Sequence, residues 1–249
     1  MSRAGNASDA AVASAGKWIS GYITQSELPL HSLVFLLPAM VLFELGLTFH
    51  PSDPIAFRIL QIFFHQTGAT GRFLPLLSVV AILLTWHIAR KDAWRIHFET
   101  LWGMLVESLL LALPLLALGI SVAQWHIHIP LAANAQLWRN NAVLSLGAGI
   151  YEEFVFRLGL MTLISIVAAD IFGLHKGLSN LLMVSGSAVL FSLYHYLGAE
   201  PFQLQSFVFR TVAGVYFGVL FLTRGFGVTA GCHICYDIIV VSLQAFALH

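Results

Sequence analysis

The feature that most constrains this chain is a series of apolar stretches, each close to the length of a membrane-spanning helix. A spanning helix needs about 20 predominantly apolar residues. Seven stretches meet or approach this length, at residues 30–49, 73–89, 101–123, 142–172, 178–197, 204–223 and 226–248. Only 10% of the residues are Asp, Glu, Lys or Arg, whereas about 25% is typical of soluble proteins. The sequence therefore predicts an all-α, polytopic transmembrane helix bundle of seven to eight spans.

The segments outside these stretches complete the prediction. IAFRILQIFF at 55–64 is too short to cross a bilayer, so we expect an interfacial or re-entrant helix there. No linker or internal repeat is visible, which predicts a single membrane domain over residues 1–249 with an N-terminal interfacial segment at 1–29. The excess of Lys and Arg in alternate loops places the N-terminus in the cytoplasm. A formal net charge of zero gives no global attraction to nucleic acid.

Three charged residues interrupt the fourth apolar stretch, in YEEFVFR at 151–157. Each charge at membrane depth costs about 2.5–3.5 kcal/mol or more. Glu153 and Arg157 are four residues apart, so they share a helix face and can pair. Glu152 points about 100° away from Glu153 and has no such partner on its own helix. Its stripe consists of small residues, Ser145, Ala148 and Gly149. We therefore predict that Glu152 is a functional carboxylate inside the bundle.

Two histidines extend this set. His233 and Asp237 are again four residues apart, so Asp237 is expected to hold one imidazole nitrogen and fix the tautomer of His233. His195 ends the fifth apolar stretch, in FSLYHYLG. A carboxylate can take a proton from water, and histidines can position that water, stabilise an oxyanion or bind a metal. The zinc-protease pattern H-E-x-x-H is absent from the sequence. The set predicts hydrolytic chemistry.

The remaining polar residues have structural interpretations. Arg210 is expected to pair with Glu107 or Glu44 across helices. Together with Glu152, these residues also leave an ion-coupled transporter open as an alternative, although the lack of an internal inverted repeat counts against it. Cys232 and Cys235 are expected to be two buried free thiols. The HIH triplet at 126–128 has the spacing of a metal-ligand pair but no evident third ligand.

The motifs together resemble the CAAX-protease and bacteriocin-processing family, also called the Abi or CPBP family. These intramembrane endopeptidases are related to the Ras-converting CAAX prenyl protease. The resemblance rests on E-E-x-x-x-R at 152–157, F-x-x-x-H ending at His195 and H-x-x-x-D from His233, in the family's order. Gly214, Gly218 and TRGFGVTAGCH are also family-like. The resemblance places the catalytic core at residues 142–248, with the active site inside the bundle.

The resemblance implies peptide-bond hydrolysis within a membrane. Because the family has bacterial members, it also implies that this membrane is the cytoplasmic membrane of a bacterium. By position, Glu152 would activate water with His195 and His233, and the supporting residues would be Phe191, Glu153, Arg157 and Asp237. Members of the family are described both as metalloproteases and as glutamic proteases. Two possibilities therefore stay open: zinc or another divalent metal bound by Glu152, His195 and His233, or a site without metal. Asp237 replaces the family's more frequent Asn. The expected partner is a membrane-inserted C-terminal or leader peptide; a non-catalytic immunity protein is the alternative.

Counting depth from the start of each stretch separates the three catalytic candidates. Glu152 lies about 15 Å into the fourth stretch, whereas His233 lies about 10 Å in from the opposite face and His195 lies near the face where the fourth stretch begins. Convergence then requires a shifted boundary or a non-helical entry. TRGFGVTAG contains three glycines, so residues 224–230 are predicted to be irregular and partly inserted.

Overall fold

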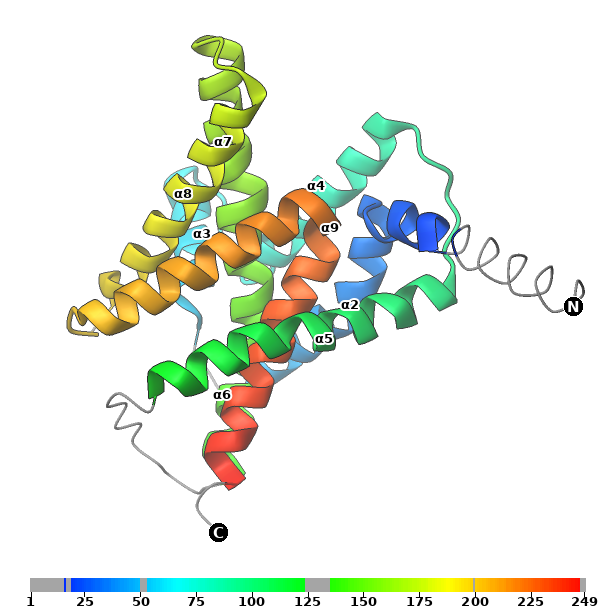
Figure 1. The fold of residues 1–249 in the computed structure, drawn as a ribbon. Helices are drawn as coiled ribbons and strands as arrows, with labels where there is room; N and C mark the ends of the chain where they lie inside the picture. Colours follow the sequence, from blue (N-terminus) through cyan, green and yellow to red (C-terminus); the bar gives the residue numbers. More distant parts are fainter. Residues whose placement is uncertain (1–15, 17–18, 50–52, 124–134, 199, 247–249) are drawn as a thin grey trace, which may run out of the picture.

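The computed structural model describes residue 16 and residues 19–49, 53–123, 135–198 and 200–246, and every element within these ranges is helical. The elements, in chain order after a helical segment at 19–26, are α2 (Pro29–Phe49), α3 (Ile55–Gln66), α4 (Leu74–Arg90), α5 (Phe98–Ala123), α6 (Ala135–Glu153), η1 (Phe154–Met161), α7 (Thr162–Ser165), η2 (Ile166–Ile171), α8 (Lys176–Tyr194), η3 (His195–Leu197) and α9 (Leu204–Phe246). Figure 1 shows how they cross in space.

The membrane character of the fold is confirmed. Five helices within the described residues are long and apolar enough to cross a bilayer, and α4 is a shorter apolar helix. One of the five, α9, consists of two limbs, so the predicted total of seven spans is recovered when both limbs and α4 are counted. The short apolar stretch at 55–64 forms α3, a helix of 12 residues. The chain is an integral membrane protein with a polytopic helical bundle.

A long rod and its return helix form one side of the molecule. The rod runs from α6 through η1, α7 and η2, where π-helical stretches replace parts of the regular helix. After the turn at 172–175, α8 runs back along the rod (Figure 1). The rod and α8 are therefore an antiparallel hairpin, and residues equally far from its turn lie at the same level.

The helix α9 bends sharply at Gly225 and packs against α5, α6 and α8 (Figure 1, orange to red). Gly225 has φ 73° and ψ −176°, whereas the helix continues on both sides of it. The predicted irregular segment at 224–230 is therefore wrong except at this residue. The glycine that follows the bend serves close packing: a Cβ on Gly227 would lie 2.9 Å from the Cα of Ser32, whose hydroxyl accepts a hydrogen bond from the Gly227 amide.

Replacing Gly225 with alanine is expected to destabilise the protein by about 1–3 kcal/mol, because an L-residue is strained in this backbone conformation. A Cβ there would also approach the Cα of Glu27 to 3.3 Å. Unfolding in detergent by added dodecyl sulfate measures the change. Gly186→Ala is the control, since Gly186 lies inside α8 and its Cβ would meet only the end of the Ile164 side chain, at 3.4 Å. An equal loss in both variants would contradict this explanation.

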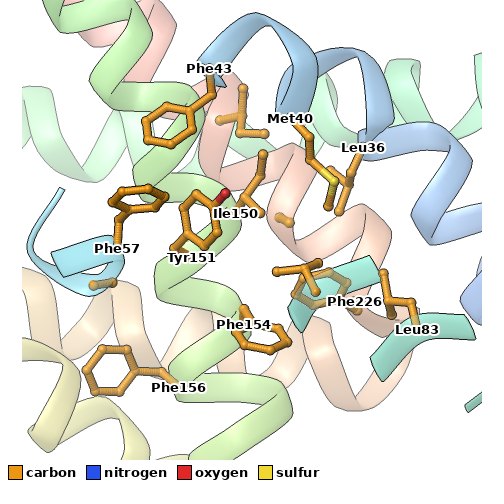
Figure 2. Packing of buried hydrophobic residues seen from close by; sticks show 14 of the residues in the cluster. Leu36, Met40, Phe43, Phe57, Leu83, Ile150, Tyr151, Phe154, Phe156 and Phe226 are labelled. Carbon is orange, nitrogen blue, oxygen red and sulfur yellow. The ribbon is translucent and has the colours of Figure 1, made fainter. Parts of the chain in front are cut away.

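The main apolar core joins α2, α3 and α4 to the rod and to the second limb of α9. Figure 2 shows Phe43 of α2 and Phe57 of α3 beside Tyr151 of α6. Their ring centroids are 5.0–5.4 Å apart, and all three side chains are buried. This packing fixes the rotation of α6 immediately before its two glutamates.

Candidate active site

Glu152 lies in the last turn of α6, and its neighbour in the sequence determines where it points. Tyr151 packs its ring against Phe43 and Phe57 (Figure 2). Successive residues of a helix project about 100° apart, so Tyr151 faces the core of α2 and α3 while Glu152 turns toward α8. There, Oε1 of Glu152 accepts a hydrogen bond from the hydroxyl of Tyr194. The carboxylate is buried, with 5% of the residue exposed.

Both motif histidines face the other oxygen of Glu152. Oε2 lies 4.0 Å from Nε2 of His195 and 3.8 Å from Nε2 of His233. On the far side of each ring, Nδ1 lies 2.8 Å from an acceptor, the Phe191 carbonyl for His195 and Oε1 of Glu153 for His233. A neutral ring held in this way carries its hydrogen on Nδ1 and its lone pair on Nε2. The arrangement thus aims three acceptors at one small space, where a water molecule can donate one O–H to the carboxylate and the other to one imidazole.

The hairpin explains why these residues meet. Glu152 lies 20 residues before residue 172 at the turn, and His195 lies 20 residues after residue 175. In an antiparallel pair of helices, equal distances from the turn give the same level along the axis. Depth counted from the predicted membrane faces was misleading, because the span Trp138–Ile171 within the rod has 34 residues and is longer than a bilayer requires.

A close approach of two helices brings His233 to the same place. A Cβ on Gly149 of α6 would lie 2.8 Å from the backbone nitrogen of Ile234 in α9. The missing side chain therefore lets the helices touch, and His233, next to Ile234, reaches the glutamates. The small-residue stripe beside Glu152 is a packed helix face.

The predicted pair of Glu153 and Arg157 is confirmed. Nε of Arg157 lies 2.9 Å from Oε2 of Glu153, and both side chains are fully buried. Arg157 also donates to the carbonyl of Gly214 at 3.3 Å, and its guanidinium lies 4.7 Å from the ring centroid of Phe191. Glu153 thus neutralises a buried cation through one oxygen and holds His233 through the other.

The expected role of Asp237 is corrected by this arrangement. Glu153, not Asp237, lies within hydrogen-bond distance of His233 Nδ1. Oδ2 of Asp237 is 3.6 Å from Nε2 of His233, on the side of the ring that faces Glu152. The His233 ring also stacks on Phe217 at a centroid distance of 4.6 Å. Asp237 therefore adds a further acceptor at the site, because the longer reach of Glu153 from α6 already secures the ring.

Arg210 and Glu107 form ion pairs away from the Glu152 site, and the predicted partners of Arg210 are wrong. Arg210 makes two 2.9 Å hydrogen bonds to Glu200 in the loop before α9, because that carboxylate is close along the chain. Glu107 instead pairs with Arg224, at 2.6 Å, and accepts from Tyr22 at 2.5 Å. Burial and this hydrogen bond raise the pKa of Tyr22, so its hydroxyl stays a donor.

Two other predictions have different outcomes. Cys232 and Cys235 are free thiols, as expected, but only Cys232 is buried and Cys235 is half-buried. The HIH triplet at 126–128 lies outside the described residues.

Tyr194 is the one residue of this cluster that the sequence analysis missed. It follows Phe191 by three residues and directly precedes His195. A tyrosine inside an apolar stretch, beside a motif histidine, was the available signal. A phenol among aromatic neighbours nevertheless has the pattern of an ordinary packing residue, and only the fold puts the Glu152 carboxylate beside it.

The predicted metal ligands do not fit a zinc ion as they are placed. Zinc ligands lie about 2.0–2.2 Å from the ion, so tetrahedral donor atoms are about 3.3 Å apart. The distances from Glu152 Oε2 to Nε2 of His195 and His233 are 4.0 and 3.8 Å. Among the described residues, no three His, Cys, Asp or Glu side chains form a group that could hold a metal.

Fold and cluster together define an integral membrane protein with carboxylate and imidazole groups gathered inside its helix bundle. Residues 133–239 match the model of the Rce1-like family, described as type II CAAX prenyl endopeptidase Rce1-like. This segment contains all three motifs, so the match confirms the resemblance to the CAAX protease family. The family indicates a membrane endopeptidase. No curated protein and no solved structure matches the chain.

Proposed function

We propose that this protein is an intramembrane endopeptidase in which Glu152 activates a water molecule for attack on a peptide bond. One observation carries the proposal: Oε2 of Glu152 and Nε2 of both His195 and His233 face the same buried space, within 4.0 Å of that oxygen. A general base must reach the water that it deprotonates directly. A water there is within hydrogen-bond reach of the carboxylate and an imidazole at once.

The chemistry follows from these positions. The water oxygen forms a bond to the substrate carbonyl carbon while its proton passes to Oε2 of Glu152. The tetrahedral intermediate then collapses, the C–N bond breaks, and the proton held by Glu152 passes to the leaving amine. His195 and His233 orient the water through Nε2, and a protonated ring can donate a hydrogen bond to the oxyanion. Glu153 keeps His233 in place, and Arg157 balances the charge of Glu153.

The proposed substrate is a peptide segment that enters the bilayer, such as a C-terminal or leader segment, and the proposed location is a bacterial cytoplasmic membrane. An apolar groove of about 400 Å³ lies between α2, α5 and α9, and its lining includes Ile234, the residue after His233. This groove supports the proposal that the substrate segment is apolar. A prenyl group on the substrate rests on the family description alone. Two of the carboxylates that a transporter could use, Glu44 and Glu107, instead lie beside the cations of Arg72 and Arg224.

The test is hydrolysis of a peptide library by the purified protein in detergent or liposomes, in water enriched in ¹⁸O. The library contains apolar C-terminal and leader peptides, with and without a prenyl group. We expect cleavage with one ¹⁸O atom in the new carboxyl group, and none with a Glu152→Ala preparation. Equal cleavage by both preparations would contradict the proposal. Protection of cells from a toxin by both, without cleavage by either, would favour the immunity alternative. Zinc analysis of the same samples tests the metal prediction.

A further inference from the structure

Tyr194 is buried in direct contact with the proposed base, and the mechanism above gives it no role. Its hydroxyl donates to Oε1 of Glu152, and 6% of the residue is exposed. We propose that Tyr194 is a positioning residue that holds Oε1 of Glu152, so that Oε2 faces the two imidazoles and serves as the base. This inference rests on the proposed function and assigns the two oxygens of one carboxylate to different tasks.

The need for such a residue comes from the freedom of a glutamate side chain. The terminal torsion of glutamate is broad, so an unheld carboxylate turns either oxygen toward the water. Among the described side chains, the Tyr194 hydroxyl alone lies at hydrogen-bond distance from the Glu152 carboxylate, since the nearest nitrogens of His195 and His233 are 3.8–4.0 Å away. One fixed hydrogen bond on Oε1 leaves Oε2 as the free oxygen.

The phenol can act in this way because its own ring is held in place. The centroid of the Tyr194 ring lies 4.9 Å from that of the Phe156 ring in the rod and 4.4 Å from that of the His195 ring, which belongs to the next residue in the sequence. Phe156 itself packs edge-on against Phe191. The hydroxyl is therefore carried by a packed aromatic cluster that also contains the His195 ring, so Tyr194 couples the position of the base to that of one histidine.

The same hydrogen bond has a second consequence. A donor that points at a carboxylate favours its ionised form, and only the ionised form accepts a proton from water. The titratable groups around Glu152 are His195, His233, Glu153 and Asp237, and they are the same with and without the phenol. Without the phenol, the buried Glu152 carboxylate is therefore protonated more readily. Removal of the hydroxyl should therefore reduce the rate and also move the pH at which activity begins, whereas damage to packing changes only the amount of active protein.

The test is Tyr194→Phe, which removes one oxygen atom and keeps the ring. We expect kcat to fall about 10- to 100-fold, the rate equivalent of a hydrogen bond to a charged group, with KM changed less than about threefold. The acidic limb of the kcat profile should move to higher pH. This shift is measured within one preparation, so it does not depend on the fraction of folded protein.

Tyr151→Phe is the matched control. Tyr151 is also a buried tyrosine of the bundle, and its hydroxyl has no hydrogen-bond partner in the described structure. The same chemical change there should leave kcat and its pH profile unaltered.

The outcomes separate this inference from the proposed function. Wild-type kcat and pH profile in Tyr194→Phe, together with an inactive Glu152→Gln variant, would overturn the inference and leave the proposed function standing. A lower kcat with an unmoved acidic limb would also overturn it, as would the same change in Tyr151→Phe. Full cleavage by Glu152→Gln would remove the proposed function and the inference together.

Discussion

Replacing Glu152 with glutamine is expected to lower kcat/KM about 100- to 10,000-fold, the range that general-base catalysis contributes. Glutamine has nearly the shape of glutamate, and its amide oxygen can still accept the hydrogen bond from Tyr194. Its amide group cannot take a proton from water. The substitution therefore removes the proposed chemistry while it keeps the hydrogen bond between residue 152 and Tyr194, and the rate of peptide cleavage measures the effect.

A matched control comes from a second buried glutamate. Glu44 lies in α2, is 8% exposed and has no hydrogen bond to its carboxylate oxygens in the described structure. Glu44→Gln removes the same charge outside the site, so the variant protein should cleave the peptide at the wild-type rate. If Glu152→Gln retained more than about one tenth of the activity, Glu152 would not be the general base.

Replacing Arg157 with methionine is expected to destabilise the protein by about 3–5 kcal/mol, the typical loss when one member of a buried ion pair is removed. The change leaves the fully buried carboxylate of Glu153 without its cation, 2.9 Å away in the wild type. His233 Nδ1 is then the remaining partner of Glu153. Unfolding by dodecyl sulfate in detergent micelles measures the loss.

A double variant tests the cause of this loss. In Glu153→Gln/Arg157→Met both charges are absent, and a buried pair without either charge is often neutral relative to the intact pair. The intact pair is also incompletely hydrogen-bonded, since Nη1 of Arg157 has no hydrogen-bond partner among the described residues. We therefore expect the double variant to regain at least about 2 kcal/mol over Arg157→Met. Additive losses would show that Arg157 stabilises the bundle through packing instead.

Helix spacing explains which parts of the site were predictable. Glu153 and Arg157 are one turn apart, so their pairing follows from the geometry of a single helix. The same rule failed for His233 and Asp237, because it compares only residues of one helix. Glu153 of α6 is nearer to Nδ1 of His233 than Asp237 is to either nitrogen. A rule about neighbours along one helix says nothing of a better partner on another helix.

The ion pairs outside the site show the same limit. Glu107 and Arg224 are 117 positions apart in the sequence, and the bend at Gly225 places Arg224 beside α5. Arg210 has its partner in the adjoining loop, at Glu200. The sequence shows that charges at membrane depth need partners, but the choice among carboxylates depends on how the helices pack.

By itself, the sequence determined the membrane helices, the burial of charge in YEEFVFR and the family motifs, because apolar length, the cost of buried charge and residue spacing are local properties. The tertiary structure decided the rest. The equal arms of the rod and α8 bring Glu152 level with His195, and the missing side chain of Gly149 admits His233. The contact of Tyr194 with Glu152 arises from the same packing. These contacts join residues on different helices, whose relative depth and rotation are set by packing between helices.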